Sequence, residues 1–145
     1  MQGKGSGRSN EQSAFCIGGE RTGVFATVKQ LKQAGLVCSV LSNTIALHWE
    51  KLCSSCDYPS FGLFDRLFAS YLIECAKPEQ ASFSFVSNAL KLCGAECLLI
   101  DDSLLNVYGA EAAGWRAMLF TDAAQLQHDV ITLLQRANHA SVNAR

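Results

Sequence analysis

The amino-acid sequence predicts an α/β domain in which helices cover both faces of a parallel β-sheet. Short, almost wholly apolar runs alternate along the chain with segments whose apolar residues recur at helical spacing. A strand that is apolar on both faces needs cover on both sides, and the crossover helices between parallel strands supply it. The predicted architecture is therefore a Rossmann-like three-layer sandwich.

Three predicted units share one pattern: a helix with an apolar face, a glycine at its end, and a short apolar strand after it. In chain order they are helix 23–34, Gly35 and strand 36–41; the helix after Pro78, Gly94 and strand 97–100; and the helix from Leu104, Gly114 and strand 117–120. This repetition predicts parallel strands joined by helices.

Three further segments complete the predicted fold. Asp122 is expected to cap a final helix that carries an apolar face. The segment "SAFCIGG" (13–19) is expected to form a first strand, and "FDRLFASYLI" (64–73) a short helix and another strand. With both strands included, the sheet would have five.

The composition fits one globular domain. The chain has 145 residues, of which 49% are hydrophobic and 17% charged, enough to bury a sizeable core. We expect a flexible leader over 1–12, a single domain over 13–137 and a polar tail over 138–145. The net charge of −1 gives no basic excess for nucleic acid or membrane surfaces, and no apolar run has the length of a membrane span. We therefore expect a cytoplasmic protein that binds neither nucleic acid nor membranes.

The chain contains seven cysteines. Cys38, Cys93 and Cys97 lie in apolar segments, which predicts buried, reduced thiols. The spacing of Cys53 and Cys56 is compatible with a redox pair. Together with Cys93 and Cys97 it is also compatible with a zinc site. Unpaired thiols in a loop and in the core are the favoured interpretation.

Polar side chains stand where predicted strands end, which is where open parallel sheets bind ligands. Ser42 and Asn43 follow one strand, Asp101 and Asp102 follow another, and Lys77 precedes a helix. Adjacent carboxylates repel each other, and a divalent cation removes that repulsion. Mg²⁺ takes one or two carboxylates together with water and phosphate oxygens, while a hydroxyl and a lysine suit the phosphate itself. The set predicts a site for magnesium and phosphate.

Each of these residues also has a simpler explanation. The two aspartates can cap the following helix, Ser42 and Asn43 can close a turn, and Lys77 can be an exposed residue held extended by Pro78. The functional interpretation depends on their occurring together.

Three motifs carry a resemblance to a known family. They are "VLSNT" (40–44), "AKPEQASF" (76–83) and "LLIDDSLLNVYGAEAAGWRAMLF" (98–120). In this order they resemble the second, third and fourth motifs of the haloacid dehalogenase superfamily of hydrolases, over roughly residues 23–126. The chain is most similar to the branch that holds sugar-phosphate phosphatases and the phosphatase domain of epoxide hydrolases.

The resemblance implies a role for each matching residue. Ser42 and Asn43 would bind the phosphate of a small phosphorylated metabolite, and Lys77 would hold both that phosphate and the nucleophile. Asp102 would ligate Mg²⁺, with support from Asp101. The implied ancestral reaction is attack by an aspartate on a phosphate ester, followed by hydrolysis of the acyl phosphate.

The sequence departs from the family pattern at the first motif. The nearest segment, "AFCIGGERTG" (14–23), places Cys16 where the family has its nucleophilic aspartate and Gly18 where many members have an acid/base aspartate. Asn106 stands where many members have a further acid. Cys16 as a cysteine-phosphatase nucleophile is disfavoured, since Arg21 follows five residues later rather than six. No segment corresponds to the family's cap domain, so we expect either a capless, degenerate member of the family or an incomplete copy whose true first strand was lost.

Two functions follow as expectations. The first is a capless hydrolase domain, ancestrally a Mg²⁺-dependent phosphatase, with impaired or lost catalysis because Cys16 supplies no carboxylate. The alternative is a non-catalytic module that binds phosphate or a protein on the same fold. A missing central strand would leave apolar sheet edges exposed, and a homodimer or poor solubility is expected in that case.

Overall fold

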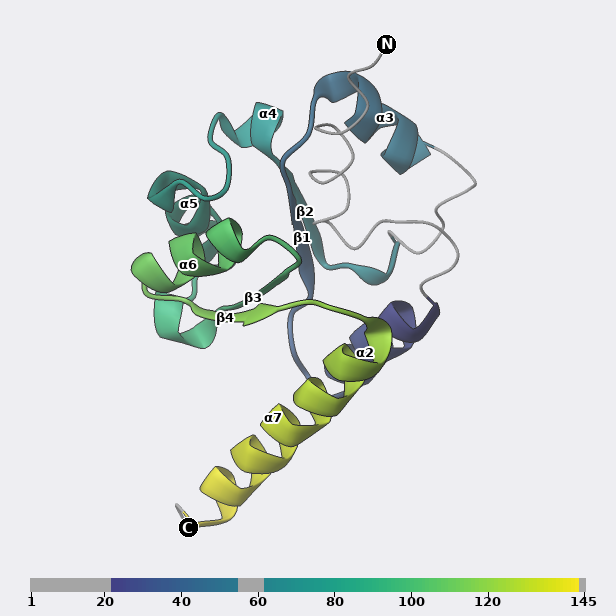
Figure 1. The fold of residues 1–145 in the computed structure, drawn as a ribbon, viewed down its shortest axis with the longest axis vertical. Helices are drawn as coiled ribbons and strands as arrows, with labels where there is room; N and C mark the ends of the chain where they lie inside the picture. The colour runs from purple at the N-terminus through teal and green to yellow at the C-terminus, as the bar shows by residue number, and fades with distance from the viewer. Residues whose placement is uncertain (1–21, 55–61, 144–145) are drawn as a thin grey trace.

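A computed structural model describes residues 22–54 and 62–143 of the chain (Figure 1). Helices and strands alternate, which confirms the α/β class. The elements in chain order are α2 (Thr22–Gln33), β1 (Ser39–Ser42), α3 (Ala46–Ser54), β2 (Arg66–Ala69), α4 (Ser70–Ile73), α5 (Gln80–Leu90), the 3₁₀ helix η2 (Gly94–Glu96), β3 (Leu98–Asp101), α6 (Leu104–Ala112), β4 (Arg116–Leu119) and α7 (Ala123–Asn143).

The described strands form two parallel pairs rather than the one continuous sheet that was predicted. β1 pairs with β2, with Leu41 opposite Phe68, and β3 pairs with β4, with Leu99 opposite Ala117. The segment 64–73 holds the predicted strand and short helix, as β2 and α4. The fifth predicted strand, 13–19, lies outside the described residues.

Apolar side chains from both strand pairs share one core. Leu41 and Phe68 of the first pair cluster with Leu99 of the second, and Phe83 of α5 meets Trp115 edge to face, with ring centroids 5.4 Å apart. A second cluster joins α2 to α7 (Figure 1) and contains Val24, Phe120, Leu126 and Val130. The two clusters fix α5, α6 and α2 around the strands.

The predicted helix ends are correct at two glycines and wrong at the third. Gly35 and Gly114 adopt positive φ of 88° and 86°, as expected of residues that end helices. α5 instead ends at Leu90, and Lys91 takes the left-handed conformation with φ 57°. Gly94 begins η2, where a Cβ would lie 2.9 Å from the carbonyl oxygen of Gly114. Gly94 therefore permits a close approach of two loops.

The last helix begins as predicted. The main-chain N–H of Gln125 donates to the Asp122 carboxylate at 2.8 Å, which caps α7. α7 continues to Asn143, so the residues expected as a polar tail are helical up to that point. Within the described ranges, no helix combines the length and apolar character needed to cross a membrane.

Candidate functional site

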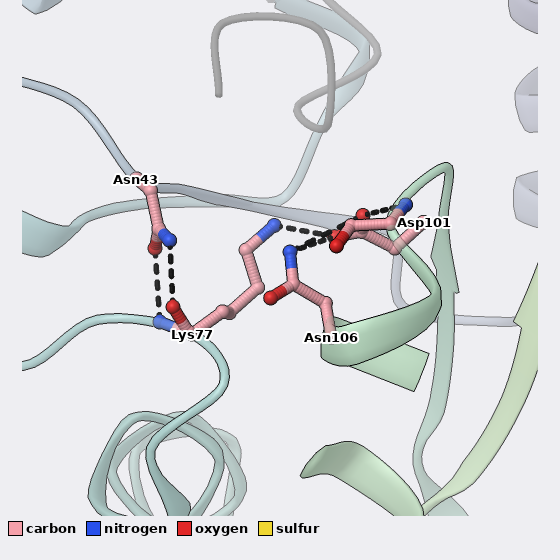
Figure 2. A network of polar contacts seen from close by, with 5 residues as sticks. Asn43, Lys77, Asp101 and Asn106 are labelled. Carbon is pink, nitrogen blue, oxygen red and sulfur yellow. Dashed lines mark hydrogen bonds and ion pairs between the residues drawn. The ribbon is translucent and has the colours of Figure 1, made fainter. Parts of the chain in front are cut away.

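The carboxyl ends of β1 and β3 lie on either side of Lys77 (Figure 2). Asn43 directly follows β1, and Asp101 is the last residue of β3. Lys77 is on the turn between α4 and α5, and its side chain extends toward Asp101. The structure therefore brings together predicted site residues from three separate motifs.

Lys77 and Asp101 form a buried ion pair. The Lys77 Nζ lies 2.6 Å from Asp101 Oδ2, and both side chains are fully inaccessible to solvent. Two further groups donate to this carboxylate: the main-chain N–H of Ser103 at 2.8 Å and the Asn106 amide at 3.2 and 3.3 Å. Charges taken out of water are tolerated when they are paired and their remaining hydrogen-bonding capacity is satisfied, and this carboxylate meets both conditions.

The Asn43 side chain fixes the main chain of Lys77. Its Nδ2 donates to the Lys77 carbonyl oxygen at 2.8 Å, and its Oδ1 accepts from the Lys77 N–H at 2.9 Å. Both polar ends of the amide are used, so Asn43 cannot rotate without losing two hydrogen bonds. Asn43 thus acts here as a positioning residue that ties the end of β1 to the lysine.

Close packing of α6 also positions the lysine. A Cβ added at Gly109 would lie 2.6 Å from the Pro78 carbonyl oxygen and 2.7 Å from its Cβ. Only a residue without a side chain lets α6 approach the Lys77–Pro78 turn this closely. Asn106 lies one helical turn earlier, so the same approach brings its amide to Asp101. A glycine in the middle of a predicted helix was the available signal for this contact.

Ser42 ends β1 and is 1% exposed. Its hydroxyl has no hydrogen-bond partner among the described residues. Buried hydroxyls are almost always satisfied in folded proteins, by protein, water or ligand. A strand-end hydroxyl without a partner among the described residues has the capacity to bind an oxygen-bearing ligand.

Asp102 differs from its neighbour. It is exposed, and desolvation followed by the nearby charge of Asp101 raises its pKa above the ordinary value. A cation at this carboxylate would offset that repulsion. Within the described ranges no group of three or more histidine, cysteine or acidic side chains surrounds a metal position. The donors present fit Mg²⁺ held by Asp102 and completed by water and phosphate oxygens.

The remaining predicted residues are placed as follows. Cys16 and Cys56 lie outside the described residues. Cys38 and Cys97 are buried as predicted, and burial raises the pKa of both thiols. The prediction for Cys93 is wrong: this thiol is exposed and contacts Glu96, because it follows α5 in a loop rather than extending its apolar face.

The described residues thus form a parallel α/β domain with a serine, a buried lysine–aspartate pair and a further aspartate at its strand ends. Residues 16–114 of this chain match the haloacid dehalogenase-like hydrolase family. The match covers more than half of the chain, and the chain belongs to this family.

Individual relatives include a phosphatase. The sesquiterpene phosphatase astK of Aspergillus oryzae is 29% identical over 96 residues, which are 66% of this chain and 48% of that protein. The chain thus spans about half the length of this curated relative.

Solved structures agree with the family assignment. A crystal structure of an uncharacterized protein from Corynebacterium glutamicum has 26% identity and a TM-score of 0.65, with 75% of this chain and 78% of that chain covered. The haloacid dehalogenase-family enzyme bt-2542 of Bacteroides thetaiotaomicron, in complex with magnesium and inorganic phosphate, has 27% identity and a TM-score of 0.58, with 67% and 50% covered. The second structure supports the use of magnesium within the family.

Proposed function

We propose that this chain carries the phosphate- and magnesium-binding part of a phosphatase site that acts on small phosphorylated metabolites, and that its own turnover is impaired. The observation that carries the proposal is the buried Lys77–Asp101 pair, together with a buried Ser42 hydroxyl at the end of β1 that has no hydrogen-bond partner among the described residues. A structural core gains little from such an arrangement, because an apolar pair of similar volume is often at least as stable.

Each residue has a separate role in this proposal. The Ser42 hydroxyl and the Lys77 ammonium would donate to phosphate oxygens, and their fixed positions would avoid reorganisation when charge develops. Asp101 neutralises and orients Lys77, and Asn43 holds its main chain. Asp102 would ligate Mg²⁺, which supplies charge stabilisation to the phosphate when bound.

Impaired turnover follows from the first motif. A thiol at Cys16 supplies neither the carboxylate that attacks phosphorus in this family nor a hard oxygen ligand for Mg²⁺. A chain that keeps the phosphate-binding residues without this carboxylate would bind phosphate better than it hydrolyses phosphate esters. If hydrolysis is lost completely, the chain is the non-catalytic binding module that the sequence also allows.

The test combines binding with hydrolysis. Inorganic phosphate is titrated into the native chain by calorimetry with and without Mg²⁺, and hydrolysis of p-nitrophenyl phosphate is measured on the same samples. We expect Mg²⁺-dependent phosphate binding that weakens about tenfold or more in Ser42→Ala and Asp102→Asn. Ser42→Ala removes no hydrogen bond within the described protein, so folding is preserved, and Glu111→Gln is the control for loss of one acidic charge. Hydrolysis that persists undiminished in Ser42→Ala, Lys77→Met and Asp102→Asn would contradict the site.

A further inference from the structure

Exposed apolar side chains gather in the segments that follow β1, β2 and β3, which are residues 43–49, 70–74 and 102–110. Half of the large apolar side chains that are exposed among the described residues belong to these segments, and Leu47 and Leu105 are each 71% exposed. Single exposed apolar residues are common, but a group of them in one place marks a binding surface. The group, called the apolar rim below, consists of Ile45, Leu47, Leu72, Leu104, Leu105 and Tyr108.

Hydrogen bonds join the three segments at one end of the strands. The Thr44 N–H donates to the Ser70 hydroxyl at 2.9 Å, which links the segment after β1 to the segment after β2. Asn43 bonds to the main chain of Lys77, and Lys77 pairs with Asp101 at the end of β3. Figure 1 shows α3 and α4 at this same end of β1 and β2. The apolar rim therefore lies beside the same strand ends as the candidate site.

The first turns of α6 contribute three residues of the rim. The buried face of this helix is formed by other residues: Asn106, Val107 and Ala110. Leu104, Leu105 and Tyr108 are on the exposed face, where side chains three and four positions apart are neighbours. Ser103 alone separates Leu104 from Asp102. Apolar surface thus begins directly beside the carboxylate that fits Mg²⁺.

Polar side chains of the same segments already bond within the protein. The Ser70 hydroxyl accepts from the Thr44 N–H and donates to the Thr44 carbonyl at 3.1 Å. The Asn43 amide is used by the main chain of Lys77, and the Asn106 amide by a buried carboxylate. These three side chains are engaged, so a ligand with many hydroxyl groups gains nothing from them and loses hydrogen bonds to water beside the rim.

We propose that the site takes the phosphate of an apolar ester, whose hydrocarbon group contacts the apolar rim. This inference rests on the proposed phosphate site and adds the class of its substrate. The anionic phosphate is complementary to the Lys77 ammonium and to a magnesium ion at Asp102, and the hydrocarbon group gains by leaving water against the rim. A sugar phosphate is complementary to the first part of this surface alone.

Calorimetric titration of the full-length chain in the presence of Mg²⁺ tests the proposal. The ligands are inorganic phosphate, methyl phosphate, n-hexyl phosphate and glucose 6-phosphate. Each methylene group that leaves water on binding raises the affinity by up to about fourfold. We therefore expect n-hexyl phosphate to bind at least about tenfold more tightly than methyl phosphate. Glucose 6-phosphate should bind no more tightly than methyl phosphate.

Substitutions in the rim locate the hydrocarbon group. Leu47→Ser and Leu105→Ser change exposed side chains, so folding is preserved. The double variant should lose about tenfold in affinity for n-hexyl phosphate and keep its affinity for methyl phosphate. Ile131→Ser is the control, because it removes an exposed apolar side chain from α7 outside the rim. It should leave both affinities unchanged.

The outcomes separate this inference from the proposed function. If methyl and n-hexyl phosphate bind equally well, or glucose 6-phosphate binds best, the inference is overturned and the phosphate site stands. The inference is also overturned if the double variant keeps the preference for n-hexyl phosphate. The same holds if that variant dissociates a dimer in light scattering with unchanged affinities, because the rim is then an interface between copies. If neither inorganic phosphate nor any ester binds, the proposed function fails as well.

Discussion

The ammonium group of Lys77 lies 2.6 Å from the Asp101 carboxylate, with both side chains fully buried. Asp102, the next residue along the chain, is exposed. Two adjacent aspartates thus have different environments: Asp101 is paired with the lysine inside the protein, and Asp102 is exposed to solvent. This difference allows their roles to be separated by single substitutions.

Asp101→Asn should lower the free energy of unfolding by about 3–5 kcal/mol at neutral pH, because it leaves the Lys77 charge buried without its partner. Urea denaturation measures the change. Asp102→Asn is the matched control, since it makes the same chemical change one residue away at an exposed position. We expect no loss of stability there. Equal losses in the two variants would contradict the assignment of the buried pair.

Gly109→Ala should destabilise the protein even though alanine is normally favoured over glycine inside a helix by about 1 kcal/mol. The added methyl group would lie 2.6 Å from the Pro78 carbonyl oxygen, so α6 or the turn that carries Lys77 must move. Thermal denaturation and phosphate titration together report the effect. Gly62→Ala is the control, because none of the residues that the structure describes lies within 4 Å of its Cβ position. A gain in stability at Gly109 would show that the close approach is absent.

Asp65 should make stability sensitive to acid. The Cys38 N–H donates to its carboxylate at 2.8 Å and, with Lys32 nearby, lowers the pKa below the ordinary value of 3.8. Between the lowered and the ordinary value only the unfolded chain binds the proton, so stability falls as the pH drops through that range. The advantage of the native chain over Asp65→Asn should therefore be complete above about pH 4 and shrink below it.

Chemical denaturation between pH 2.5 and 7 measures this difference for Asp65→Asn. Glu111→Gln, which removes an exposed carboxylate on α6, provides the comparison for the loss of one acidic charge. A difference in the free energy of unfolding between the native chain and Asp65→Asn that grows on acidification would contradict the hydrogen bond between Cys38 and Asp65.

Much of the fold could be predicted because apolar runs and glycines report burial and helix ends directly. The strand boundaries are shifted by one to three residues, as for the predicted 36–41 and the observed Ser39–Ser42, since an apolar run marks burial rather than hydrogen bonding. Lys91 shows a further limit. It takes the left-handed conformation that the sequence favoured for Gly94, because the helix ends one turn earlier.

The site was less predictable from sequence for two physical reasons. Identical neighbours such as Asp101 and Asp102 cannot be distinguished when the preceding strand is apolar throughout, because no alternation shows which side faces inward. The contact of Asn43 with Lys77 joins residues 34 positions apart, and such a pairing follows from tertiary structure alone. Gly109 was the one residue whose type gave a local signal of close packing.

We propose that a phosphate- and magnesium-binding site remains in this chain without its nucleophile, and restoring the nucleophile at position 16 is the decisive experiment. The measurement is hydrolysis of p-nitrophenyl phosphate by Cys16→Asp with and without Mg²⁺, beside the native chain and Cys53→Asp, which makes the same change at an exposed cysteine. We predict a Mg²⁺-dependent gain of about tenfold or more, confined to Cys16→Asp and lost when Lys77→Met is added. A folded Cys16→Asp variant no more active than the native chain or Cys53→Asp would contradict the account.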